Sequence, residues 1–179
     1  MAFREDVTVA LPTLGQAEAM NAIFIDRYRD TTPGSMPWIP DRIELYRTEG
    51  VEMFRRRIVD TTQNPQRHFI RAAMIDQKVV GFACGGIDFE GNDGYSYEKC
   101  AAMEGLIIDR QYEGWGAATM LEQARQAWAK DIGCTAIEGE IIVDNKRSWQ
   151  FFERMGYKDI GQEPGPFPAM VFKRIRLTL

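Results

Sequence analysis

A glycine-bearing turn between an apolar segment and a helical segment is the part of the chain best suited to bind an anion. The turn contains Gly114 and Gly116, which remove side chains where a ligand would approach the backbone. Apolar residues then repeat at helical spacing, so a helix is expected to direct its free N–H groups and its positive end at the turn. A pyrophosphate suits such a site. The same glycines would equally serve a tight turn that lets a helix pack on a sheet.

The turn does not match two common nucleotide sites. It is not a dinucleotide fingerprint, because the third glycine is absent, and it is not a Walker loop, because no Gly-Lys-Ser/Thr follows. Taken by itself, the turn therefore predicts an anion site without identifying the ligand.

Strand and helix patterns alternate on both sides of this turn. Strands are expected over 7–11, 68–75, 78–87, 100–108, 135–143, 157–161 and 167–177. Helices are expected over 18–29, over a stretch with Val51, Phe54 and Ile58 on one face, over 114–131 and over 145–155. Asp76-Gln77 is expected to form a hairpin turn. Residues 31–41, with their prolines, and the polar residues 88–99 are expected to be irregular.

The order strand, helix, strand across residues 100–143 predicts a parallel pair of strands with a right-handed crossover. We find no internal repeat and no linker, so we expect one domain over residues 1–179.

The composition is that of an ordinary globular protein. The chain has 179 residues, of which 45% are apolar and 27% are charged, and its net charge is −4. This charge weakly disfavours nucleic acid as a partner, because phosphate backbones require a basic surface. No stretch approaches 18 uncharged apolar residues, and the first ten residues contain acids where a signal peptide needs an apolar run. We therefore expect no membrane span and no secretion.

The cysteine and histidine content is low. Cys84, Cys100 and Cys134 are an odd number at wide spacing, which predicts reduced thiols in a cytoplasmic protein. No Cys/His cluster has metal-ligand spacing, so no metal is expected. The lone histidine, His68, lies in a strand pattern, where a structural role is the commoner one.

Two motifs, in this order, resemble the GCN5-related N-acetyltransferase (GNAT) superfamily. That family has Gln/Arg-x-x-Gly-x-Gly/Ala at a strand-to-helix turn, and residues 111–116, QYEGWG, fit it in full. A later family motif begins with Asn and ends with Glu-Lys/Arg-x-Gly-Phe/Tyr, and residues 145–157 fit it at nearly every place. The pair of motifs is much more specific than either alone. The match is clearest from residue 78 onward.

The resemblance implies a mixed α/β fold of three layers. A central, twisted, mostly antiparallel sheet of roughly six to seven strands would be flanked by about four helices, with one splayed parallel strand pair. Many proteins of this fold pair through edge strands or helices, which leaves a homodimer open.

The resemblance also implies an acetyl-CoA site. The backbone of Leu106, Ile107 and Ile108 would pair with the pantetheine arm as an added strand would. The N–H groups of the turn would hold the pyrophosphate. These turn residues are Gln111, Tyr112, Glu113, Gly114, Trp115, Gly116 and Ala117. From the second motif, Asn145 would lie near the pantetheine and the departing sulfur, and Ser148, Phe151 and Phe152 beside the cofactor. For both phenylalanines, plain core packing is the alternative.

The family reaction is direct attack of an amine on the acetyl thioester. The amine needs a base, for which we choose Glu104, two residues before Leu106; a partly buried carboxylate there would have a raised pKa. Pairing with a basic residue is the alternative. The oxyanion would be bound by a backbone N–H near Leu106 or Ile107. Glu138 and Glu140, on one face of the next strand, could bind a cationic substrate or pair with lysine and arginine.

One position departs from the family pattern. The tyrosine that protonates the departing thiolate falls on Phe152, which has no proton to donate. Water or substrate could supply the proton, another hydroxyl such as Tyr95 or Tyr97 could reach in, or the thiolate could leave unassisted. Tyr157 is a poor substitute, because the family uses that position to begin a core strand. The remaining alternative is that the protein binds the cofactor without catalysis.

The acceptor pocket is expected in the irregular segments. Met36, Trp38 and Ile39 could line it from residues 31–41, although a hydrophobic cap would explain them too. The loop 88–99, with its acids and tyrosines, is a second candidate wall.

Our hypothesis is thus an acetyl-CoA-dependent N-acetyltransferase acting on a primary amine of a small molecule, an amino acid or a protein. Its alternatives are a non-catalytic acyl-CoA-binding or regulatory module and an enzyme that uses another acyl donor. No nucleic acid or membrane partner is expected.

Overall fold

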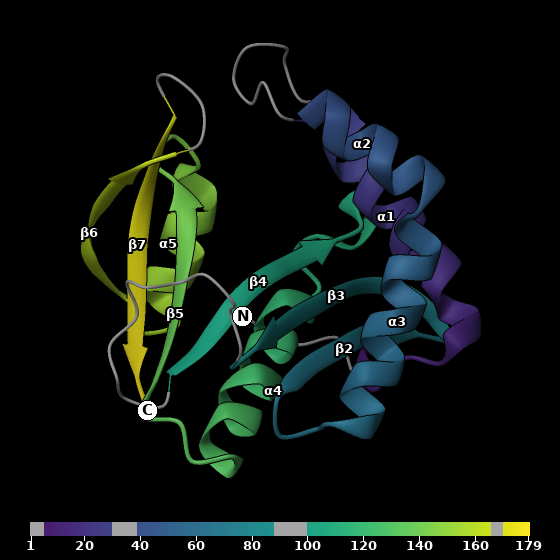
Figure 1. Cartoon of the computed structure of the whole chain (residues 1–179), viewed down its shortest axis with the longest axis horizontal. Helices are drawn as coiled ribbons and strands as arrows, with labels where there is room; N and C mark the ends of the chain where they lie inside the picture. The colour runs from purple at the N-terminus through teal and green to yellow at the C-terminus, as the bar shows by residue number, and fades with distance from the viewer. Residues whose placement is uncertain (1–5, 30–38, 88–99, 166–169) are drawn as a thin grey trace.

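Seven strands form one continuous sheet through the centre of the molecule. The structure is a computed structural model, and it describes residues 6–29, 39–87, 100–165 and 170–179. The strand order is β1-β2-β3-β4-β5-β7-β6, and every neighbouring pair is antiparallel except β4 and β5. The expected mixed sheet with one parallel pair is therefore confirmed (Figure 1).

The strands follow the expected positions closely. They are β1 (Thr8–Ala10), β2 (His68–Ile75), β3 (Lys78–Gly86), β4 (Cys100–Ile108), β5 (Ala136–Ile142), β6 (Lys158–Pro164) and β7 (Val171–Thr178). Between β2 and β3, Asp76 and Gln77 both have positive φ, as a two-residue hairpin turn of the primed type requires. The predicted hairpin is confirmed.

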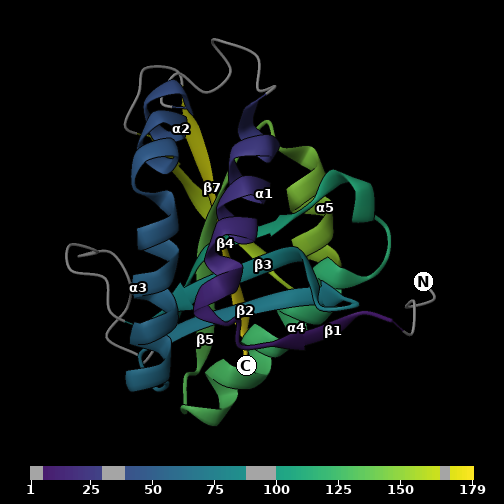
Figure 2. The same ribbon diagram turned by 90° about the vertical axis from the view of Figure 1, so that its right-hand side faces the viewer.

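The helices cover both faces of the sheet. They are α1 (Ala17–Arg29), α2 (Ile39–Thr48), α3 (Gly50–Gln63), α4 (Ala117–Asp131) and α5 (Lys146–Arg154), with short 3₁₀ turns η1 (Leu14–Gln16) and η2 (Arg110–Tyr112). Figures 1 and 2 show α1, α2 and α3 on one side of the strands and α4 on the other. Among the described residues, no helix is long and apolar enough to span a bilayer.

Two apolar cores lie on the two faces of the sheet. One joins α1 and α3 to β2 and β3 through residues such as Met20, Phe54 and Phe82. The other packs α4 and α5 against the sheet through residues such as Leu121 and Ile137. These cores fix the ends of β4 and the start of α4, from which the candidate site is built.

One helix was not expected from the sequence. The segment before β2 contains α2 and α3 as separate helices, whereas the apolar pattern indicated a single helix there. Residues 39–41 of the segment predicted to be irregular belong to α2. The break falls at Glu49, just before Gly50, where a Cβ would lie 2.1 Å from Oδ1 of Asn21 on α1. The glycine lets α3 approach α1 closely. Because Asn21 lies far from Gly50 in the chain, the local sequence pattern does not show that a glycine is needed here.

The parallel strands β4 and β5 are paired over only a short stretch. Their register joins Cys100 to Ala136, Ala101 to Ile137 and Ala102 to Glu138, and no pair follows. Beyond Ala102 the two strands separate, as Figure 1 shows. Among the described residues, no strand pairs with the side of β4 that faces β5 from Met103 to Ile108, which confirms the expected splayed pair.

Candidate active site

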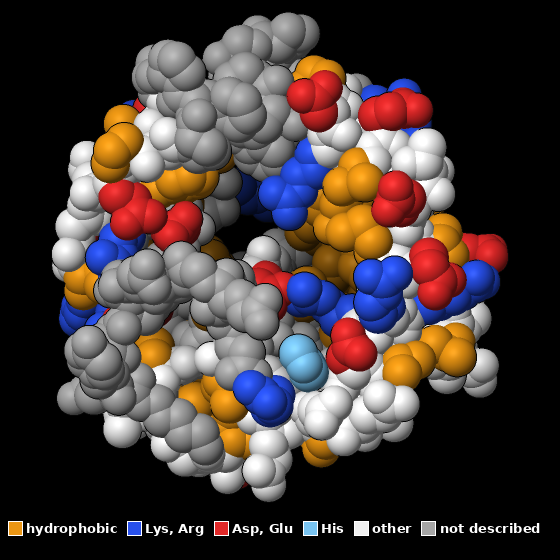
Figure 3. All heavy atoms as spheres, viewed as in Figure 1, with side chains coloured by type: hydrophobic (Ala, Val, Ile, Leu, Met, Phe, Trp, Pro, Cys, Tyr) orange, Lys and Arg blue, Asp and Glu red, His pale blue; other side chains and the backbone are white. Residues whose placement is uncertain are grey.

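A hollow opens on the molecular surface between the two halves of the sheet. Figure 3 shows acidic and basic side chains gathered around it. The far end of β4 leads from this region into the glycine-bearing turn and the start of α4. The unpaired edge of β4 and this turn are thus continuous, so a long ligand could contact both.

The glycine-bearing turn has the backbone geometry of an anion site. Gly114 and Gly116 have φ of 82° and 90°, a conformation that side chains other than glycine rarely adopt. A Cβ placed on Gly114 would meet no atom within 4 Å, so the space over the turn is open. Gly116 lies immediately before α4, so the first N–H groups of that helix point into the turn.

The N–H groups of the turn divide into two sets. That of Gln111 donates to Oδ1 of Asp109 at 3.0 Å, and those of Tyr112, Glu113 and Trp115 donate to backbone carbonyls within the turn. Within the described part of the chain, no hydrogen bond engages the N–H groups of Gly114, Gly116 or Ala117. Of the residues predicted to bind pyrophosphate, these three retain free donors.

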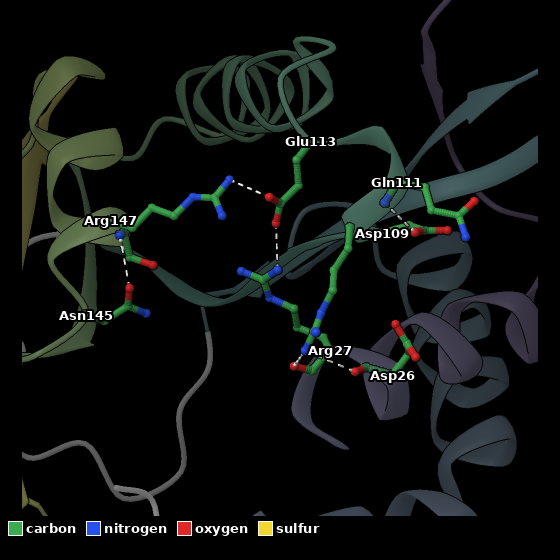
Figure 4. Close-up of polar contacts among 9 residues, drawn as sticks. Asp26, Arg27, Asp109, Gln111, Glu113, Asn145 and Arg147 are labelled. Carbon is green, nitrogen blue, oxygen red and sulfur yellow. Dashed lines mark hydrogen bonds and ion pairs between the residues drawn. The ribbon is translucent and has the colours of Figure 1, made fainter. Parts of the chain in front are cut away.

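A glutamate of the turn joins the two sides of the hollow. Oε1 of Glu113 lies 2.6 Å from Arg27 of α1, and Oε2 lies 2.7 Å from Arg147 of α5 (Figure 4). We call these three residues the Glu113 bridge. Burial acts to raise the pKa of Glu113, but the hydrogen bonds from Arg147 and Arg27 outweigh it and lower the pKa. The carboxylate is therefore charged at neutral pH and neutralises two arginines beside the free N–H groups.

Replacing Glu113 with glutamine is expected to strengthen acetyl-CoA binding. The change removes a negative charge beside the predicted phosphate site, and it releases both arginines. Because an exposed ion pair is worth up to about 1 kcal/mol, we expect the dissociation constant to fall about two- to fivefold. Calorimetric titration at low and high salt measures this, and the gain should shrink at high salt.

Glu153→Gln is the matched control for this change, since it removes the same charge from an exposed position on α5. A weaker affinity in Glu113→Gln than in this control would mean that Glu113 supports cofactor binding instead of opposing it.

The second motif forms α5 and its cap. Oδ1 of Asn145 accepts the N–H of Ser148 at 3.1 Å, so Asn145 caps the helix. This cap explains an asparagine at that position without a cofactor contact, and the predicted contact of Asn145 with pantetheine stays a prediction. Phe151 is half-buried and Phe152 is buried, with its ring 5.2 Å from that of Tyr157. Phe152 therefore has the core role that was its alternative reading.

Tyr157 belongs to a fully buried polar network. Its hydroxyl donates to Oε1 of Glu122 at 2.7 Å, and Arg125 donates to the other oxygen of the same carboxylate. Burial is the main cause that raises the pKa of Tyr157. Its proton is thus committed to Glu122, which agrees with the expectation that Tyr157 is a poor substitute for the missing family tyrosine.

Removing the hydroxyl with Tyr157→Phe is expected to lower the free energy of unfolding by roughly 1–3 kcal/mol, because a buried carboxylate loses a donor. Urea denaturation measures the change. In Tyr112→Phe the lost hydroxyl accepts a hydrogen bond from exposed Lys78, so this control should stay near the wild-type value. Equal stability of the two variants would contradict the importance of the network.

The candidate base, Glu104, lies on β4 next to the point where β4 and β5 separate. Its side chain is 22% exposed, and its carboxylate forms an ion pair with Arg57 of α3. Pairing of Glu104 with a basic residue was the alternative left open by the sequence, and the structure shows that this residue is Arg57. A Cβ on Gly86 would lie 3.5 Å from Oε1 of Glu104 and 4.0 Å from Nδ1 of His68, so both side chains lie beside Gly86.

Glu138 is placed differently from what substrate binding requires. It is 2% exposed, and its two oxygens face Arg176 at 2.7 Å and Arg174 at 3.4 Å. Its charge is thus balanced inside the protein, as the alternative of pairing with arginine states. The other predicted acceptor contacts, Met36 and Trp38, lie outside the described residues. The same is true of Tyr95 and Tyr97 and of the side chain of Ile39.

Sequence reasoning missed three arginines of the site: Arg27, Arg57 and Arg147. Each forms an ion pair with a residue far away in the chain. The described part of the chain contains no cluster of His, Cys, Asp and Glu suited to a metal ion.

Comparison with known proteins identifies the class. The model of the acetyltransferase (GNAT) family matches residues 23–157, which is most of the chain. The chain therefore belongs to the acetyltransferase (GNAT) family. Its members transfer an acetyl group from acetyl-CoA to an amine, and the resemblance recognised from the two motifs is confirmed.

Individual relatives are more distant. An aminoglycoside N(6′)-acetyltransferase type 1 of Acinetobacter genomosp. 13 is 27% identical over 120 residues, covering 67% of this chain and 77% of the relative. The PaiA N-acetyltransferase of Thermoplasma acidophilum, solved with coenzyme A, has a TM-score of 0.70 at 15% identity, covering 97% and 99% of the two chains. YncA of Salmonella typhimurium, solved with acetyl-CoA, has a TM-score of 0.68 at 15% identity, covering 98% and 95%. The two structural matches support the fold.

Proposed function

We propose that the protein acetylates a primary amine of a small molecule, with Glu104 as the base that takes the proton from the amine. The observation that carries this proposal is the position of the Glu104 carboxylate. It lies on β4 where the strand loses its partner, and the same strand leads to the turn with free N–H groups at Gly114, Gly116 and Ala117. A cofactor bound along this edge would bring its thioester close to Glu104.

The open turn and the free edge of β4 fit acetyl-CoA in different ways. The N–H groups of the turn and the positive end of α4 would hold the pyrophosphate. The backbone of Leu106 to Ile108 would pair with the amides of the pantetheine arm, because no described strand pairs with it on that side. A backbone N–H near Leu106 or Ile107 would stabilise the oxyanion.

The transfer is a direct one between the thioester and the amine. Glu104 accepts a proton as the amine nitrogen attacks the acetyl carbonyl; the C–N bond forms and the C–S bond breaks. Burial raises the pKa of the Cys84 thiol, and burial together with Glu138 raises that of Cys100 to about 12. Neither thiol is ionised at neutral pH, which disfavours them as acetyl carriers. Phe152 has no hydroxyl and the hydroxyl of Tyr157 is bound to Glu122, so neither protonates the departing thiolate, and water, the substrate or another hydroxyl supplies that proton.

An amino sugar is the first acceptor class to test. The curated relatives are named for acetylation at the N(6′) position of aminoglycosides, and the net charge of −4 is compatible with a polycationic acceptor. Amino acids, polyamines and peptide N-termini form the comparison set, because the sequence leaves each of them open.

A calorimetric titration with acetyl-CoA followed by a thiol-release assay tests the proposal. We expect acetyl-CoA to bind, and free thiol to appear fastest with a small primary amine. Binding without thiol release from any amine would support the non-catalytic alternative. Fastest release with peptide N-termini would contradict the small-molecule acceptor, and absence of binding would contradict the cofactor site.

We infer a cytoplasmic location, because Cys84, Cys100 and Cys134 form no disulfide with any described residue. We also infer that the chain is one domain, since a single sheet connects its described parts.

A further inference from the structure

Glu104 occupies a β-bulge. In the pairing of β3 with β4, Cys84 lies opposite Gly105 and Gly85 lies opposite Met103, so Glu104 has no partner across the ladder. A bulge changes the direction of a side chain and bends the strand. The candidate base therefore depends on an irregular stretch of backbone, and something must hold that stretch in place.

Arg125 of α4 supports the bulge from one face of the sheet. This arginine is fully buried, and its Nη1 donates to the backbone carbonyls of Cys84 at 3.1 Å and Gly105 at 3.3 Å. Its other nitrogens bind Glu122, whose carboxylate also accepts from Tyr157. A buried ion pair persists only when its hydrogen bonds are satisfied, and here the carbonyls at the bulge help to satisfy them. Arg125 therefore fixes the backbone beside Glu104.

Arg57 of α3 holds the carboxylate from the opposite face. Its Nη1 donates to Oε2 of Glu104, whereas Oε1 has no hydrogen bond to any described residue. The two oxygens are thus distinguished: one is engaged by the arginine and the other is available to accept a proton. Gly86 lies beside Oε1, and a Cβ there would be 3.5 Å from that oxygen.

The other groups near the carboxylate are few. His68 of β2 shares the space beside Gly86, and the buried, neutral thiol of Cys84 on β3 lies near Arg57 and Glu104. Arg125 approaches from α4, where its charge is balanced by Glu122. Among the described groups, Arg57 is therefore the cation that acts most directly on Glu104.

We propose that Arg57 is a positioning residue for acetyl transfer: it binds Oε2 of Glu104 and directs Oε1 at the amine. The inference rests on the proposed role of Glu104 as the base. Arg57 itself does not contact the reacting atoms. The side chain of Arg57 is 36% exposed, and a partly exposed ion pair adds little to the stability of the fold. The main contribution of Arg57 is therefore to hold the Glu104 carboxylate in position.

Arg57→Gln and Arg57→Lys test this role in steady-state assays with the fastest acceptor. Because misplacement of a catalytic group by about 1 Å can cost up to about a hundredfold, we expect kcat in Arg57→Gln to fall between about tenfold and a hundredfold. The KM for acetyl-CoA should not change. Arg57→Lys, which keeps the charge, should recover part of the rate. Arg55→Gln is the control, since Arg55 lies on the same helix and pairs only loosely with Glu18 and Glu52.

The split between kcat and KM separates positioning from simple packing. A positioning role predicts that kcat falls while the KM for acetyl-CoA stays the same, and that Arg57→Lys recovers rate that Arg57→Gln loses. Equal losses in the two Arg57 variants would indicate packing instead.

A double-mutant cycle distinguishes the possible failures. In a Glu104→Gln background, Arg57→Gln should cause no further loss of rate. An equal loss in both backgrounds would overturn the positioning role and leave Glu104 as the base. An unchanged rate in Glu104→Gln alone would overturn the proposed base.

Discussion

Acetyl-CoA binding is expected to be lost when Gly114 is replaced by tryptophan. The glycine has φ of 82°, and the space in front of its α-carbon is empty within 4 Å. An indole placed there would cover the free N–H groups of Gly116 and Ala117, where the pyrophosphate is expected. We expect affinity to fall by at least about a hundredfold, since the loss of several charge-assisted hydrogen bonds costs more than about 3 kcal/mol. Calorimetric titration measures this loss.

Two further variants show whether bulk or backbone strain is responsible. Gly161 also has positive φ and open space around it, but it lies on β6, away from the turn. Gly161→Trp should therefore keep wild-type affinity. Gly114→Ala introduces the strain with little bulk, so it should weaken binding less than Gly114→Trp does. If Gly114→Trp bound acetyl-CoA normally, the phosphates would have to lie elsewhere.

Turnover, in contrast, should depend on Glu104. In Glu104→Gln the side chain keeps its size but cannot accept a proton, so we expect kcat to fall about 10²- to 10⁴-fold, the usual contribution of a general base. Affinity for acetyl-CoA should stay nearly unchanged, because the carboxylate lies beside the acceptor end of the proposed site. Stopped assays of thiol release together with calorimetry measure the two quantities separately.

The matched control for this change is Glu52→Gln, which removes the same charge from an exposed position on α3. It should leave kcat unaltered. A Glu104→Gln enzyme as fast as this control would exclude Glu104 as the base and direct attention to His68, its neighbour across Gly86.

The regular elements near the site were predictable because their signals are local. The bounds of β2 and β4 agree with the expected ones, since each is a long apolar run between polar turns. The positive φ of Gly114 and Gly116 likewise follows from residue type and position. Such features depend on neighbours in the chain, and a single sequence displays those neighbours directly.

The contacts that define the candidate site were not predictable in the same way. Glu113 pairs with Arg27 and Arg147, and Glu104 pairs with Arg57, across long separations in the chain. An ion pair of this kind leaves no periodic pattern in the sequence. A charged residue on a helix surface has the same sequence context whether or not it forms an ion pair with a distant residue. The bulge at Glu104 was also hidden, since it depends on the register between two strands.

Local chemistry could have refined one prediction. Asp109 precedes Gln111 by two residues, which is the spacing at which an aspartate accepts a backbone N–H in a turn. That spacing indicates that the N–H of Gln111 is already occupied. The phosphate donors are thereby limited to the later part of the turn and the first turn of α4.

The short pairing between β4 and β5 has a consequence for the whole molecule. Among the described residues, three pairs form the ladder between the two halves of the sheet. A bound pantetheine arm along β4 would supply amide groups where a neighbouring strand is missing, so the cofactor would complete the hydrogen bonding of the sheet. Binding of acetyl-CoA should then make the sheet more rigid, and the Tm of the protein should rise with the concentration of acetyl-CoA.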